Sequence, residues 1–228
     1  MFSYTKISAG EHLCEYLYTR LIDLSFWDRF ETKHLHITGR AQEFRQFMQA
    51  GIALNMTRRL ILAAENATKF AMPSDPGFLA YLDAPLNRFG LYPINRNGAL
   101  ARLIRDSLVN SRHTISYSLR KHLLNWATSE HPNCYLCGRS LNFRLSPSEK
   151  DEDITLDHLW PQAYGGDSEE ENLLPACRLC NTEKKRDYPL WAACNVHTLN
   201  IGADPSVGAL QSIGGYFGYS GNFVAKLV

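Results

Sequence analysis

The sequence has no apolar run that approaches the roughly 20 residues of a membrane span, and no internal repeat, low-complexity tract or phosphate-binding glycine-rich loop. It also lacks an excess of either charge, since 24 Lys and Arg stand against 23 Asp and Glu for a net charge of +1. Its first residues do not show the charged-then-apolar layout of a secretory signal. These absences exclude membrane-spanning, fibrous and disordered classes, and we expect a globular cytoplasmic protein without membrane contact.

Cysteine is also scarce, with six residues in a chain of 228, which is too few for a fold held by disulfides. Four of the six nevertheless form two Cys-x-x-Cys pairs, Cys134 with Cys137 and Cys177 with Cys180. Two thiolates three residues apart can bind one ion, and two such pairs complete the tetrahedral site that Zn²⁺ prefers. The sequence therefore predicts a closed, structural zinc site. The other interpretations are disulfides, or a redox-active pair that leaves the second pair unexplained.

The two cysteine pairs are separated by 39 residues, 138–176, where a simple zinc ribbon has roughly 15 to 20. An insertion of this length must form structure of its own. Its apolar and β-branched residues predict a strand over 154–161 and a short second strand over 172–175, which we expect Pro175 to end. A helix that becomes basic towards its end is predicted over 178–186. The two pairs thus frame a strand–loop–strand–helix unit.

The polar residues of this unit, in their order and spacing, resemble the HNH endonuclease family. The matching positions are Asp157-His158, Pro161, Gly165-Gly166, Asn172-Leu173, Asn181 and Lys184, together with the two cysteine pairs. The resemblance covers about residues 134–187 and implies a ββα-metal core that hydrolyses nucleic-acid phosphodiester bonds to leave a 5′-phosphate, with double-stranded DNA as the expected substrate. The family ends this pattern with His or Asn, so Asn181 does not imply an inactive domain.

The residue types also suit phosphodiester hydrolysis. Neutral imidazole is the best side-chain base near pH 7, so His158 is expected to take the proton of the attacking water. Asp157 and Asn181 offer hard oxygen ligands for a catalytic Mg²⁺ or Mn²⁺ ion. Asp157 and His158 can serve one site only if their strand ends or bends there. The resemblance implies that Asn172 holds the loop by hydrogen bonds, and Lys184 is expected to face the phosphate.

Each of these residues also has a simpler interpretation. His158 can be a core residue, the two asparagines a turn residue and a helix cap, and Lys184 part of a solvated helix end. The alternative function is therefore a catalytically silent, zinc-stabilised DNA- or protein-binding subunit of a larger complex, or an inert structural subunit.

Elsewhere the sequence is predominantly helical. Apolar residues recur at helical spacing in four segments, 8–24, 40–66, 99–109 and 115–126. Ser8 and Glu11 form a candidate capping box, and Gly51 is a possible break in the second of these helices. The proline- and glycine-rich segment 71–98 is predicted to consist mainly of loops.

These patterns predict an α+β fold with three regions. Residues 1–125 form a mostly helical region for DNA or partner binding, and residues 126–195 form the HNH-like module with its structural zinc. The third region, 196–228, is rich in glycine and aromatic residues and is expected to pack on the core. Its aromatic residues leave base stacking as the other interpretation.

Charge divides unevenly between the regions. Residues 1–125 carry 16 Lys and Arg against 10 Asp and Glu, a net charge of +6, whereas residues 126–228 carry 8 against 13, a net charge of −5. A basic cluster marks the later helices, formed by Arg102, Arg105, Arg112, Arg120 and Lys121. These residues either contact the DNA backbone or keep a helix face solvated. We expect further DNA contacts to come from a second copy of the chain or from a partner such as an ATPase subunit, in a microbial defence or restriction system.

Overall fold

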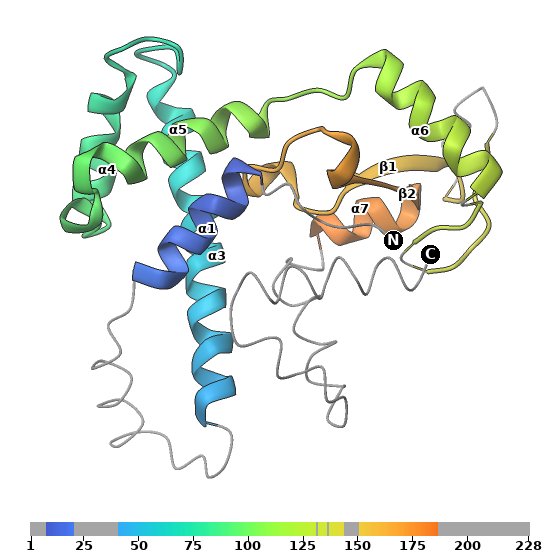
Figure 1. Cartoon of the computed structure of the whole chain (residues 1–228), viewed down its shortest axis with the longest axis horizontal. Helices are drawn as coiled ribbons and strands as arrows, with labels where there is room; N and C mark the ends of the chain where they lie inside the picture. The colour runs from blue at the N-terminus through green and yellow to red at the C-terminus, as the bar shows by residue number, and fades with distance from the viewer. Residues whose placement is uncertain (1–7, 21–40, 131, 136, 144–150, 187–228) are drawn as a thin grey trace. The chain divides into compact units, whose positions relative to one another are not determined.

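The computed structural model of the protein describes residues 8–20, 41–130, 132–135, 137–143 and 151–186 (Figure 1). The expected C-terminal region, 196–228, lies outside the described residues, as do the last residues of the first expected helix. The described chain divides into two units. The helical unit consists of residues 8–111 with 163–165, and the hairpin unit consists of the described residues from 112 onward without 163–165.

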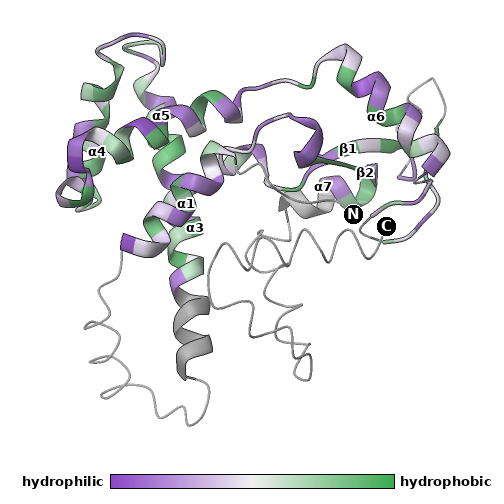
Figure 2. Ribbon diagram, viewed as in Figure 1, coloured by the Kyte–Doolittle hydropathy of each residue, from purple (hydrophilic) through white to green (hydrophobic). Residues whose placement is uncertain are grey.

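Three long helices build the helical unit: α1 (Ala9–Arg20), α3 (Ala41–Ala67) and α5 (Ala99–Ser111), all at predicted positions. They pack against one another and bury Leu and Ala side chains in a shared core, whose members include Leu13, Leu17, Ala53, Leu60, Ala64, Leu100 and Leu108. Figure 2 shows apolar and polar residues alternating along these helices, as expected when one face is buried.

The predicted capping box is confirmed at the start of α1. The Ser8 backbone N–H and hydroxyl donate to Glu11 Oε2 at 2.6 and 2.8 Å, and the Glu11 N–H donates to Ser8 Oγ at 3.4 Å. The possible break at Gly51 is absent, because α3 continues through it. The buried neighbours Ala53 and Leu54 anchor the helix there, and this packing offsets the roughly 1 kcal/mol that a glycine costs a helix.

The proline-rich segment between α3 and α5 contains only short elements. These are the α-helix α4 (Asp83–Arg88) and the 3₁₀ turns Phe78–Leu82, Tyr92–Ile94 and Arg96–Gly98. No helix in the described part of the chain combines the length and the apolar character that crossing a membrane requires.

The hairpin unit is a ββα arrangement with one additional helix. Its antiparallel strands are β1 (Ile154–His158) and β2 (Leu173–Cys177), and they are followed directly by α7 (Arg178–Arg186). The additional helix, α6, spans Tyr117–Glu130. With the helical unit, this arrangement confirms the predicted α+β class.

The hairpin contributes residues to two apolar clusters. Leu156 and Leu173 pack with Leu123 of α6 in one cluster. Ala176 and Cys177 belong to a second cluster, which also contains the first cysteine pair's Cys134 and the neighbouring Tyr135. α6 belongs to the hairpin unit, which begins at residue 112, and the expected division of the chain at residue 125 stays a prediction.

Strand ends differ from the sequence expectation in two places. β1 stops at His158, three residues before the expected end, so Asp157 and His158 occupy the end of the strand. β2 continues through Pro175, which was expected to end it. Proline is tolerated here because the sheet has two strands and both are edges. The Pro175 carbonyl still accepts a bond from the Tyr135 N–H at 3.2 Å.

Candidate metal centres and active site

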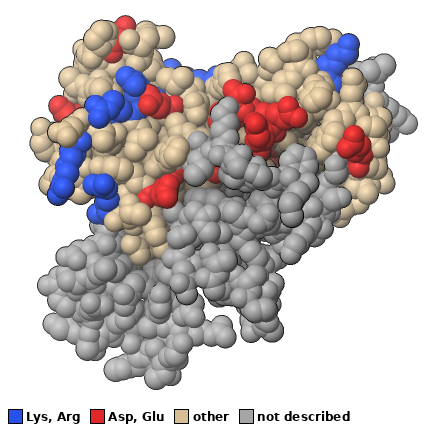
Figure 3. Space-filling model, viewed as in Figure 1, with Lys and Arg blue, Asp and Glu red and all other residues tan. Residues whose placement is uncertain are grey.

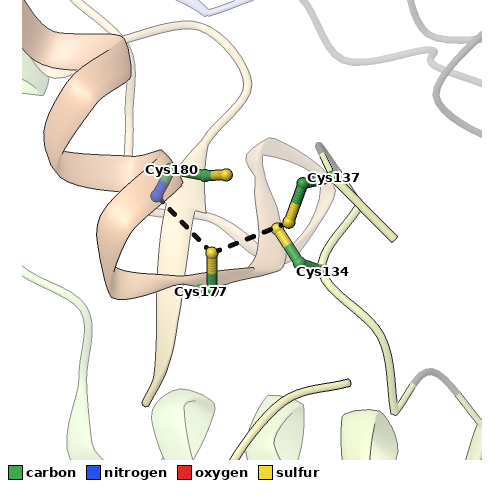
Figure 4. Close-up of side chains that lie close together, drawn as sticks. All are labelled: Cys134, Cys137, Cys177 and Cys180. Atoms are coloured by element: carbon green, nitrogen blue, oxygen red, sulfur yellow. Dashed lines mark hydrogen bonds between the residues drawn. The ribbon is translucent and has the colours of Figure 1, made fainter. Parts of the chain in front are cut away.

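The four cysteines of the two pairs converge in the hairpin unit (Figure 4). Their four sulfur atoms all lie within 4.8 Å of one another, and the sulfurs of Cys137 and Cys177 are 3.9 Å apart. Four ligands at the Zn–S distance of about 2.3 Å place tetrahedral sulfurs about 3.8 Å apart, whereas a disulfide requires about 2.05 Å. The cluster therefore has the geometry of a metal site and can hold an ion such as Zn²⁺.

Local backbone structure places each pair of sulfurs. A tight turn closes the first pair, with the Cys134 N–H donating to the Arg139 carbonyl and the Gly138 N–H donating to the Cys134 carbonyl, both at 2.8 Å. Gly138 has φ of 70°, which favours glycine. Cys177 ends β2, and Cys180 lies in the first turn of α7. The backbone N–H of Cys180 donates to the Cys177 sulfur at 3.5 Å.

Burial and the close approach of the four sulfurs change the pKa values of the cluster's thiols. Burial raises the pKa of Cys177, although hydrogen bonds with Cys180 act in the opposite direction, and burial together with the neighbouring sulfurs raises the pKa of Cys180. At Cys137 desolvation also acts upwards, but hydrogen bonds from the Arg139 backbone and the other thiols outweigh it and lower the pKa. Four thiolates cannot share this volume without a cation, so metal binding must be coupled to proton release.

Asp157 lies buried at the end of β1, with 5% of its surface exposed. Its Oδ2 accepts a hydrogen bond from the hydroxyl of Tyr135 at 2.5 Å. Tyr135 immediately follows Cys134, so a residue of the cysteine cluster's own turn orients this carboxylate. The sequence analysis missed Tyr135, because the bond spans 22 residues and follows no recognisable motif.

Asn181 lies on α7 against the same face of β1 that carries Asp157. Its amide nitrogen donates to Thr155 Oγ1 at 3.0 Å and to the Leu156 carbonyl at 3.3 Å. Thr155 and Asp157 are two residues apart on the strand, so their side chains share a face about 6.6 Å apart along it. The two predicted ligands are thus brought to one face of the hairpin.

The amide oxygen of Asn181 bears on whether these residues can hold the predicted catalytic ion. This Oδ1 atom is buried and has no hydrogen-bond partner among the described residues. An unsatisfied buried acceptor costs about 1–3 kcal/mol, and a neutral amide oxygen is a suitable ligand for Mg²⁺ or Mn²⁺. The oxygen atoms of Asn181 and Asp157 therefore fit a hard divalent cation.

His158 is half-buried and lies where β1 ends. Its Nε2 atom is 3.0 Å from Ser168 Oγ. β1 includes His158, which pairs with Leu173, so its side chain points to the face opposite Asp157 and a site shared by the two residues stays a prediction.

Asn172 joins the two sides of the loop between the strands. Its Oδ1 accepts from the Trp160 N–H at 2.7 Å, and its Nδ2 donates to the carbonyls of Trp160 and Asp167 at 3.1 and 2.7 Å. A glycine is required beside this network, because a Cβ at Gly166 would overlap the Trp160 carbonyl. The glycine turn and Asn172 thus shape the loop that follows His158.

Lys184 belongs to α7, three residues beyond Asn181, and its contact with phosphate stays a prediction. The hairpin unit carries both charges at its surface. Glu169, Glu170 and Glu171 precede β2, and Figure 3 shows acidic side chains gathered on this unit.

The hairpin unit also has exposed cations of its own. They include Arg112, Arg120 and Lys121, three of the five residues of the predicted basic cluster. Whether these residues contact DNA stays a prediction.

The hairpin and α7 form a small ββα arrangement framed by four cysteines that could hold a metal ion. Residues 134–187, about a quarter of the chain, match the family model described as HNH endonuclease, so this segment carries an HNH domain. No curated protein and no solved structure gave a match.

Proposed function

We propose that the protein is a metal-dependent HNH endonuclease that hydrolyses phosphodiester bonds, with double-stranded DNA as substrate. The observation that carries this proposal is the buried, unpartnered Oδ1 of Asn181, on the face of β1 that bears Asp157. A buried acceptor without a partner is costly, and a bound cation would satisfy it. The match of residues 134–187 to HNH endonucleases supports the same assignment.

In this mechanism the chain's own residues divide the work. His158 takes the proton of the attacking water, and Asn172 fixes the loop that follows this histidine. Asp157 and Asn181 would hold Mg²⁺ or Mn²⁺, which supplies positive charge to the scissile phosphate and to the leaving 3′ oxygen. Lys184 supplies a further positive charge to the phosphate backbone.

The four cysteines hold a structural Zn²⁺ ion in the same proposal. A site with four thiolates has no open position for substrate, so its contribution is to the stability of the domain. It ties the turn at Cys134 to the junction of β2 and α7.

The proposed setting is a cytoplasmic microbial defence or restriction system. The exposed Arg112, Arg120 and Lys121 supply contacts to the DNA backbone beside the active site. The neighbouring carboxylates of Glu169–Glu171 repel the DNA phosphates. This repulsion supports additional DNA contacts from a second copy of the chain or from a protein such as an ATPase subunit.

Plasmid cleavage with and without Mg²⁺ tests the activity. His158→Ala is expected to lower the rate by about 10²- to 10⁴-fold, because a general base contributes that much. His122→Ala is the matched control, since His122 is exposed on α6 and pairs only loosely with Glu170, at 3.5 Å.

Undiminished cleavage by a folded His158→Ala protein would refute the assigned role. A wild-type protein that binds zinc and DNA but never cuts would instead identify the catalytically silent binding subunit.

A further inference from the structure

Ser168 lies beside the proposed general base and has no role in the HNH pattern quoted above. It precedes the acidic loop and is 2% exposed. Its Oγ atom is 3.0 Å from His158 Nε2 and 2.7 Å from the carbonyl oxygen of His113. A buried hydroxyl group thus connects the imidazole to the backbone just before α6.

The direction of the hydrogen bonds in this chain can be deduced. A carbonyl oxygen only accepts, so the single hydroxyl proton of Ser168 is donated to His113. Ser168 Oγ must then accept at its contact with the imidazole, which makes His158 Nε2 the protonated nitrogen. In a neutral ring the lone pair consequently resides on Nδ1.

Gln162 completes the arrangement. Its amide nitrogen donates to the His113 carbonyl at 2.6 Å and lies 3.3 Å from Ser168 Oγ. The Ser168 hydroxyl oxygen then accepts from both His158 Nε2 and the Gln162 amide, which uses both of its lone pairs, while its proton is donated to the His113 carbonyl. The hydroxyl cannot turn around without breaking these bonds, so it can act only as an acceptor towards His158.

We propose that Ser168 is a positioning residue that holds the His158 imidazole in one orientation and in the Nε2–H tautomer, which directs Nδ1 to the attacking water. This inference rests on the proposed function, in which His158 is the general base. A base must present its lone pair to the proton that it abstracts. An imidazole in the other tautomer would present an N–H there.

The kinetic test is Ser168→Ala, which removes the acceptor without adding volume. We expect kcat for plasmid cleavage to fall by about 10- to 100-fold, less than for His158→Ala, because the base is present but misdirected. KM should stay within about threefold of wild type. Ser129→Ala is the control, because Ser129 is an exposed α6 serine whose hydroxyl contacts only nearby backbone carbonyls, and it should leave both constants unchanged.

The double variant separates positioning from a general structural effect. If Ser168 acts through the imidazole, Ser168→Ala should cause no further loss in the His158→Ala background, measured in single turnovers at high enzyme concentration. A full additional loss there, or a Ser168→Ala protein with wild-type kcat, overturns the proposal.

A spectroscopic readout is independent of cleavage. Long-range ¹H–¹⁵N spectra of histidine-labelled protein, with His158 assigned by its absence in His158→Ala, should show the Nε2–H tautomer in the wild type and a mixture in Ser168→Ala. Equal tautomer populations in both proteins contradict the inference. Wild-type cleavage by His158→Ala would instead refute the role of His158 as general base, absence of cleavage by the wild type would refute the proposed function, and the tautomer measurement would still decide whether Ser168 orients the imidazole.

Discussion

The cysteine cluster and the proposed hydrolytic centre belong to the same hairpin unit but are specified in different ways. Each cysteine pair is placed by one local turn, and the sulfurs themselves are the site. The hydrolytic residues are instead oriented by partners elsewhere in the unit: Tyr135 for Asp157, Thr155 for Asn181, and Ser168 for His158. A structural metal site can thus be encoded by its ligands alone, whereas a reactive site also needs the residues around it.

The largest expected effect comes from breaking the cysteine cluster. Cys177→Ser removes a ligand from the junction of β2 and α7, and structural zinc sites contribute about 10–16 kcal/mol of apparent binding free energy. We expect loss of bound zinc, measured by elemental analysis, loss of the hairpin unit's thermal transition, and loss of cleavage.

Cys14→Ala is the control for this experiment. Cys14 lies in the core of the helical unit, and burial raises its pKa to about 12, so it remains a thiol at neutral pH. This variant should retain its full zinc content. Normal folding of a zinc-free protein with all four cluster cysteines changed to Ser would contradict a structural role for the metal.

A smaller and more selective effect is expected at the other centre from Asn181→Ala. The change removes the buried Oδ1 atom, so Mn²⁺ affinity, followed by electron paramagnetic resonance, should fall at least about tenfold. Zinc content should not change. Thr182→Ala, at the next and exposed position of α7, is the matched control. Unchanged Mn²⁺ binding by Asn181→Ala would remove this residue from the proposed ligands.

Much of the fold follows from local sequence signals. Helical spacing predicted α1, α3, α5 and α6, β-branched and apolar residues indicated β1, and a short apolar run indicated β2. The two wrong predictions, at Gly51 and Pro175, arise where tertiary packing or the position of a strand outweighs local sequence signals. Packing of flanking alanine and leucine carries α3 through Gly51, and edge position lets β2 continue through Pro175. Local propensity is a weak guide wherever tertiary contacts decide.

The residues of the candidate site also divide into those that the sequence indicates and those that only the folded structure reveals. Spacing alone indicated the four cysteines, and residue type with family pattern indicated Asp157, His158 and Asn181. Neither signal could indicate Tyr135 or Ser168, because their hydrogen bonds join residues separated by up to 55 positions. Such partners become visible only when the chain is folded.

The smallest expected effect concerns the point where the two centres meet. Tyr135→Phe keeps the ring that packs among the buried cysteines and removes only the hydroxyl that donates to Asp157 Oδ2. We expect zinc content to stay at the wild-type level, because no sulfur ligand is touched. Mn²⁺ affinity should fall by about three- to tenfold, at the low end for loss of a partner that orients a ligand.

The matched control for Tyr135→Phe is Tyr16→Phe, which removes a hydroxyl bonded to the Ile94 carbonyl at 2.6 Å in the helical unit. Tyr16→Phe should change neither the zinc content nor the Mn²⁺ affinity. If Tyr135→Phe released zinc, the hydroxyl would be part of the cluster's own stability. If it left Mn²⁺ affinity unchanged, Asp157 would be held without help from the cysteine turn. Weaker Mn²⁺ binding with full zinc occupancy would show that the turn of the structural site also orients a ligand of the reactive one.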